Sequence, residues 1–72
     1  MILVFKVNLS HLNPEEIDNK LRKIFPNMFG FSYRYEDNYL FLELPEEKDI
    51  KEDIQINMTK VFKDAKFIEI CQ

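Results

Sequence analysis

The 72-residue chain has few of the residues on which several kinds of site depend. Its single glycine, Gly30, excludes a glycine-rich phosphate loop, and its single cysteine, Cys71, excludes an internal disulfide. Its one histidine, His11, has no cysteine or histidine at a metal-ligand spacing. No apolar run approaches the roughly 20 residues that a membrane-spanning helix needs. We therefore expect no metal, no cofactor and no insertion into a membrane.

The length leaves room for one small domain, which we take to be residues 1–72. Apolar residues make up 46% and charged residues 32% of the chain, which is typical of a globular domain and not of a disordered tail. Met1–Leu9 is apolar but is interrupted by Lys6, and no small-residue cleavage site follows it, so we do not expect a signal peptide. Together with the lone cysteine, this indicates a cytoplasmic protein.

Charge and composition indicate the setting of the protein. Thirteen acidic and ten basic residues give a net charge of −3, whereas proteins that bind duplex nucleic acid usually carry the opposite excess. Phe, Tyr, Met, Ile, Asn and Lys, which have AT-rich codons, account for 35 of the 72 residues. We therefore expect an AT-rich bacterium or its phage as the source.

Hydrophobic patterning predicts six elements in the order strand, helix, strand, strand, helix, strand. Their predicted ranges are 2–9, 14–25, 29–36, 39–44, 50–62 and 66–71. The first helix has the clearest start, because Asn13-Pro14-Glu15-Glu16 combines an N-cap, a proline at the first helical position and a capping-box glutamate. Residues 54–59 also alternate like a strand. A helix is favoured there by its acidic start and by the apolar stripe outside that piece.

The two middle strands form a predicted hairpin around Asp37-Asn38, a two-residue turn suited to positive φ. If Glu36 pairs with Tyr39, the register assigns every side chain to a face. Arg34 then lies across from Phe41, where a cation–π contact can form. The side chains expected to face the core are Phe31, Tyr33, Tyr35, Leu40, Leu42 and Leu44.

This order predicts the α+β class and the split βαβ, or ferredoxin-like, arrangement (βαββαβ). Right-handed crossovers place both helices on one face of a four-stranded antiparallel sheet, with the order fourth, first, third, second. The other face is left to water or to a partner. By alternation it carries Ile2, Val4, Lys6, Asn8, Arg34, Tyr39, Phe41, Phe67 and Cys71, while Ile68 and Ile70 turn inward.

An apolar patch with a charged rim on this face indicates an interaction surface. We select as partner-binding residues Ile2, Val4, Lys6, Arg34, Tyr39, Phe41 and Phe67. Two other interpretations remain open. The apolar side chains could serve strand propensity alone, or they could cover one another in a homodimer.

The order of strands and helices also resembles that of the RNA-recognition motif. The first and third strands are similar to the two signatures of that family at Phe5, Asn8 and Leu9 and at Tyr39, Phe41 and Leu42. The resemblance implies that bases stack on Phe5, Tyr39 and Phe41. Lys6 stands where the family keeps an apolar residue, and Asp37-Asn38 stand where it keeps basic and glycine residues. Alternation places Phe5 in the core, so we take the likeness as one of fold.

No combination of reactive side chains indicates catalysis. His11 has no nucleophile that can be paired with it from the sequence, and Ser10 beside it suits a turn or a cap. The acidic pairs Glu15-Glu16 and Glu46-Glu47 lie at helix starts, where the helix dipole accounts for them. Cys71 reads as an ordinary, partly exposed thiol. We therefore expect no enzymatic activity.

The sequence thus predicts a small non-enzymatic protein that binds another protein, or a second copy of itself, through its outer sheet face. Its size, acidic balance and AT-rich composition favour a phage or mobile-element product that inhibits a host nucleic-acid-handling protein by covering a basic surface. The alternative is single-stranded RNA binding, with bases stacked on Tyr39 and Phe41 and with help from Lys6 and Arg34.

Overall fold

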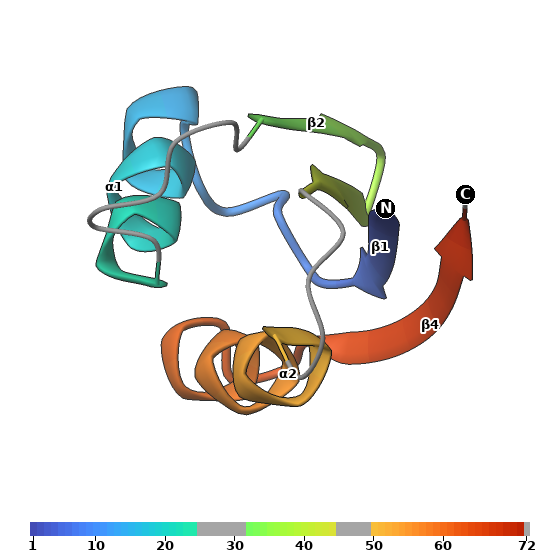
Figure 1. Cartoon of the computed structure of the whole chain (residues 1–72). Coiled ribbons are helices and arrows are strands. Elements are labelled where there is room, and N and C mark those ends of the chain that lie inside the picture. The colour runs from blue at the N-terminus through green and yellow to red at the C-terminus, as the bar shows by residue number, and fades with distance from the viewer. Residues whose placement is uncertain (25–31, 45–49, 72) are drawn as a thin grey trace.

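The computed structural model describes residues 1–24, 32–44 and 50–71, which form two layers (Figure 1). These residues contain four strands and two helices. They are β1 (Ile2–Lys6), α1 (Pro14–Ile24), β2 (Ser32–Glu36), β3 (Tyr39–Glu43), α2 (Ile50–Val61) and β4 (Lys66–Cys71). The predicted order of elements and the α+β class are confirmed.

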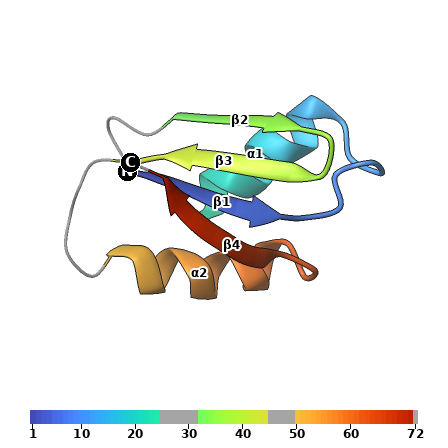
Figure 2. The same cartoon turned by 90° about the vertical axis from the view of Figure 1, so that its right-hand side faces the viewer.

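The four strands form one antiparallel sheet in the order β2-β3-β1-β4. Strands β1 and β3 lie in its centre, as expected from the apolar character of the first strand. Figure 2 shows the strands side by side, with α1 behind them and α2 below β4. The core between the layers is formed by Leu3, Phe5, Val7, Leu9, Ile17, Leu21, Leu40, Leu42, Leu44, Ile54, Met58 and Phe62. The helices therefore cover one face of the sheet, and none of the described helices covers the other.

Strand β1 ends at Lys6, three residues earlier than predicted. The chain beyond it stays attached to the hairpin turn, because the Val7 N–H donates to the Asn38 carbonyl at 2.9 Å. The Leu9 N–H then donates to Asn38 Oδ1 at 3.2 Å. Val7 and Leu9 are both buried, so this segment contributes to the core without belonging to the sheet.

Both helices are explained by local signals. The Glu16 N–H donates to Asn13 Oδ1 at 2.8 Å, and the Asn13 N–H donates to Glu16 Oε1 at 3.4 Å, which confirms the capping box of α1. In α2, Ile54 and Met58 are buried whereas Ile56 is 53% exposed. A strand would bury all three on one face, so the ambiguity over residues 54–59 is settled as a helix.

The hairpin has the predicted register, with Glu36 opposite Tyr39 and a φ of 56° at Asp37. Strand β2 is an edge strand. Tyr35 on its core-facing side is therefore 39% exposed, although alternation assigns it to the core. The predicted residues 29–31, including Phe31, lie outside the described residues.

Strand β4 corrects the prediction, because Phe67 does not face outward. Its pairing with β1 shifts between Val4 and Phe5: Glu69 lies opposite Val4, whereas Phe67 lies opposite Phe5. Ile68 is thus the extra residue of a β-bulge, which reverses the alternation on its N-terminal side. The Phe67 ring meets the Phe5 ring edge-on, with 5.5 Å between centroids, and packs against the core. Ile68 is 43% exposed instead of turning inward, while Ile70 packs against the core as expected.

A cluster of three polar side chains links edge strand β2 to α1. The Tyr33 hydroxyl donates to Asp18 Oδ1 at 2.9 Å, and Arg22 Nε donates to Asp18 Oδ2 at 2.7 Å. The hydrogen bond from Arg22, followed by that from Tyr33, holds the pKa of the Asp18 carboxyl below its ordinary value. Burial and the bond to Asp18 raise the pKa of Tyr33.

This geometry predicts a pH-dependent contribution of Asp18 to stability. Because the folded-state pKa is lowered, the contribution is complete above the ordinary carboxyl pKa of about 4 and is lost as pH falls through the folded-state value. We expect Asp18→Asn, which keeps an acceptor for Tyr33, to lower the urea midpoint at pH 7. The difference in urea midpoint between the variant and the wild type should become steadily smaller below about pH 4. A difference that stays constant across this range would contradict the assignment.

Candidate interaction surface

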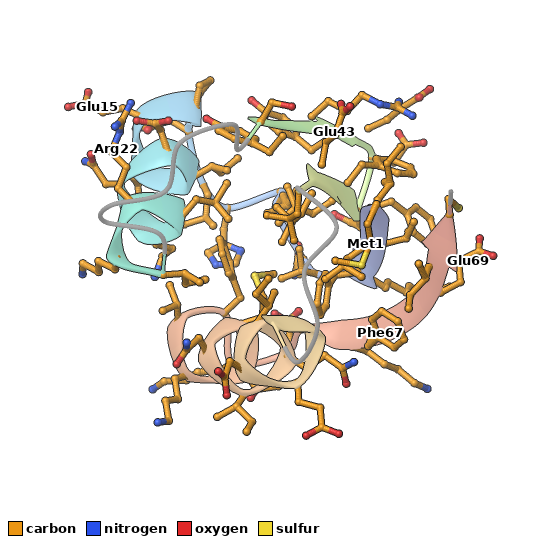
Figure 3. All side chains as sticks on the ribbon, in the orientation of Figure 1. Met1, Glu15, Arg22, Glu43, Phe67 and Glu69 are labelled. Carbon is orange, nitrogen blue, oxygen red and sulfur yellow. The ribbon has the colours of Figure 1, made fainter. Side chains whose placement is uncertain are left out.

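The sheet face that points away from the helices is the candidate site, and we call it the outer face. The strand pairings arrange its side chains in three rows across β2, β3, β1 and β4. The rows are Ser32, Glu43, Ile2 and Cys71; then Arg34, Phe41, Val4 and Glu69; then Glu36, Tyr39, Lys6 and Lys66. Figure 3 shows Glu69 extending from β4 on the side away from both helices.

Six of the seven sequence-predicted site residues share the outer face, and Phe67 alone lies on the core side. Asn8 lies beyond the end of β1, where its Oδ1 accepts from the Ser10 hydroxyl at 2.7 Å. Asn8 is therefore part of a turn, whereas the prediction placed it on the sheet face. Sequence alternation finds the rest of the face because strands β1, β2 and β3 pair without interruption.

The centre of the outer face is apolar. Val4 is only 4% exposed although no helix covers it, and Ile2 and Phe41 are half-buried. These side chains therefore pack against their own neighbours within the face. Tyr39 is 40% exposed and is the most accessible apolar group among the outer-face residues. We call the four residues Ile2, Val4, Tyr39 and Phe41 the central band. A partner gains apolar contact mainly along this band.

Arg34 lies over the Phe41 ring. Its guanidinium carbon is 4.2 Å from the centroid of the Phe41 ring, so the predicted cation–π contact forms. Beside it is a hollow of about 70 Å³, where the Ser32 hydroxyl donates to Glu43 Oε2 at 3.4 Å. Sites for drug-sized ligands usually enclose roughly 300–1,000 Å³. The hollow therefore suits a protruding side chain or a water molecule better than a small-molecule ligand.

Charges of both signs surround the band, and their positions follow a pattern. In the second row Arg34 lies on the β2 edge and Glu69 on the β4 edge. In the third row the signs are reversed, with Glu36 on the β2 edge and Lys66 on the β4 edge. Lys6 and Lys66 lie directly opposite each other, an arrangement of like charges that destabilises a strand pair.

The three positions implied by the resemblance to the RNA-recognition motif do not form one stacking surface. Phe5 is 1% exposed in the core, as alternation predicts. Phe41 is covered by the Arg34 guanidinium. Tyr39 is left as the only one of the three with a largely accessible ring.

A second hollow, of about 260 Å³, lies between the loop after β1, helix α1 and the end of α2 and includes the exposed His11. Its polar groups hold these segments together. Asp64 Oδ2 accepts from the Asn8 N–H at 2.9 Å, and Lys20 Nζ donates to the Val61 carbonyl at 3.4 Å. Within residues 1–24, 32–44 and 50–71, no three His, Cys, Asp or Glu side chains gather where they could hold a metal ion.

Comparison of the chain with protein-family models, with curated proteins and with solved structures gives no match. None of the described helices is long and apolar enough to cross a membrane.

Proposed function

We propose that this chain is a small cytoplasmic, non-enzymatic protein-binding module of the ferredoxin-like split βαβ type, and that it docks through its outer face. The observation that carries this proposal is the asymmetry of the sheet. Both helices pack against one face through a shared core, while the other presents an apolar band within a charged rim. This combination of an apolar centre and a polar rim is typical of protein–protein interfaces.

The arrangement favours a protein partner over single-stranded RNA. Stacking of successive bases needs several accessible rings along one path, and the outer face offers Tyr39 while Phe41 is covered. The rim holds as many acidic as basic side chains, which gives little net attraction for phosphate. The same balance adds no support to the prediction of a phage-encoded inhibitor that mimics an acidic surface.

Site-specific photo-crosslinking tests the proposal, because two tyrosines provide a matched pair. Tyr39 on the outer face and Tyr35 on the opposite side of the neighbouring strand are 40% and 39% exposed. We expect a photoreactive phenylalanine analogue at position 39 to yield a discrete protein crosslink in extract of the producing organism. The same analogue at position 35 should yield none.

The crosslink should disappear when Phe41→Ala is added to the position-39 variant, provided that circular dichroism shows an unchanged fold. Equal crosslinking from positions 35 and 39, or no protein crosslink from position 39, would overturn docking through the outer face.

A further inference from the structure

We infer that the partner of the outer face is a second copy of this chain, related by a two-fold axis parallel to the strands. This inference rests on the proposed function, since it names the occupant of the same face. Two sheets stacked in this way lie about 10 Å apart with their strands nearly aligned. A two-fold interface is self-complementary, so each contact between two positions occurs twice.

The symmetry decides which residues meet. Rotation about an axis parallel to the strands exchanges the two edges of the sheet and keeps each row in place. Strand β2 of one copy therefore faces β4 of the other, and β3 faces β1, because the order in the sheet is β2-β3-β1-β4. Each row of one copy then faces the same row of the second copy, with the order of its residues reversed.

Under this rotation the charges on the edges become complementary. Arg34 faces Glu69 of the second copy in the second row. Glu36 faces Lys66 of the second copy in the third row. Each pair occurs twice, so the rim supplies four contacts between opposite charges and sets the register of the two sheets.

The centre of the face agrees with the same arrangement. Phe41 faces Val4 of the second copy, which brings together the apolar groups of the central band. The opposed lysines Lys6 and Lys66, which repel each other in the monomer, gain Glu36 of the second copy as a neighbour. The dimer therefore relieves an unfavourable feature of the isolated chain.

The other two-fold arrangement of stacked sheets is disfavoured by the same charges. An axis in the plane of the sheet and perpendicular to the strands keeps each strand over its own copy. Arg34 would then face Arg34, and Glu69 would face Glu69. Like charges in contact across an interface oppose association, so the charge pattern selects the parallel axis.

The size of the face predicts a weak dimer. Four strands of about five residues cover roughly 19 by 17 Å, or about 300 Å² in projection. A stable interface of standard size buries about 800 Å² on each partner. We therefore expect a dissociation constant in the micromolar range or weaker.

Charge reversal of the Glu36–Lys66 pair tests the arrangement. Neither side chain makes a hydrogen bond or an ion pair within residues 1–24, 32–44 and 50–71, so their exchange leaves the described contacts of the monomer intact. Arg34 is unsuitable because it packs on Phe41. Sedimentation equilibrium from about 10 µM to about 1 mM covers the expected range of affinity.

The wild type should approach twice the mass of one chain at the highest concentration. Glu36→Lys and Lys66→Glu should each raise the dissociation constant about tenfold or more, because each creates two contacts between like charges. The double variant restores both contacts and should return to within about threefold of wild type. A monomeric wild type, single variants that dimerise normally, or a double variant that is not rescued would each overturn the inference.

The photo-crosslink at position 39 separates this inference from the proposed function. A product with twice the mass of the chain supports both. A product with a different protein, together with a monomeric wild type, overturns the second copy and leaves docking through the outer face in place. Absence of any product overturns both.

Discussion

Phe5→Ala is expected to lower the free energy of unfolding by about 3–5 kcal/mol, the usual cost of removing a buried phenylalanine side chain. Phe5 lies in the central strand β1, is 1% exposed and meets the Phe67 ring edge-on. Domains have about 0.05–0.15 kcal/mol of stability per residue, or roughly 4–11 kcal/mol for this chain. The variant should therefore lose between about a quarter and all of this stability, which urea titration followed by circular dichroism measures.

Tyr39→Ala is the matched control, because Tyr39 is a large aromatic residue on the neighbouring strand that faces outward. Its loss should cost no more than about 1 kcal/mol. The comparison also decides between core and surface roles for Phe5. A base-stacking phenylalanine on the sheet surface could be replaced with little loss of stability. Equal effects of the two variants would contradict the core assignment.

The parts of the fold that sequence reasoning captured are those with short-range causes. The capping box at Asn13 and Glu16 satisfies backbone groups within one turn of helix. The turn at Asp37-Asn38 sets the register of β2 and β3 directly. From that register the contact between Arg34 and Phe41 follows, and so does most of the outer face.

The parts that could not be predicted depend on contacts between distant segments. The bulge in β4 leaves no local signal, because Phe67 and Ile68 are both apolar and either one could face the core. The choice is made by Phe5, more than 60 residues away, which offers its ring to Phe67. The edge-to-edge arrangement of Glu36 and Lys66 likewise depends on the pairing of β4 with β1.

The bulge leads to the second large expected effect. Phe67→Ala should lower the free energy of unfolding by about 2 kcal/mol, less than a fully buried phenylalanine because Phe67 is half-buried. Ile68→Ala should cost no more than about 1 kcal/mol, because Ile68 is 43% exposed. With uninterrupted alternation in β4, Ile68→Ala would cost more stability than Phe67→Ala. The urea midpoints of the two variants therefore show which of the two side chains faces the core.

Deletion of Ile68 provides an independent measurement of the same feature. Without this residue, Phe67 and Glu69 become neighbours along β4 and still lie opposite Phe5 and Val4 on the faces that they now occupy. We therefore expect the deletion variant to fold and to dimerise, since Lys66 keeps its place on the outer face. In a strand without a bulge Ile68 would face the core and Phe67 the outer face, so the same deletion would force the larger Phe67 side chain into the core position that Ile68 had filled and would destabilise the fold. Loss of folding in the deletion variant, with Ile68→Ala unaffected, would contradict the bulge.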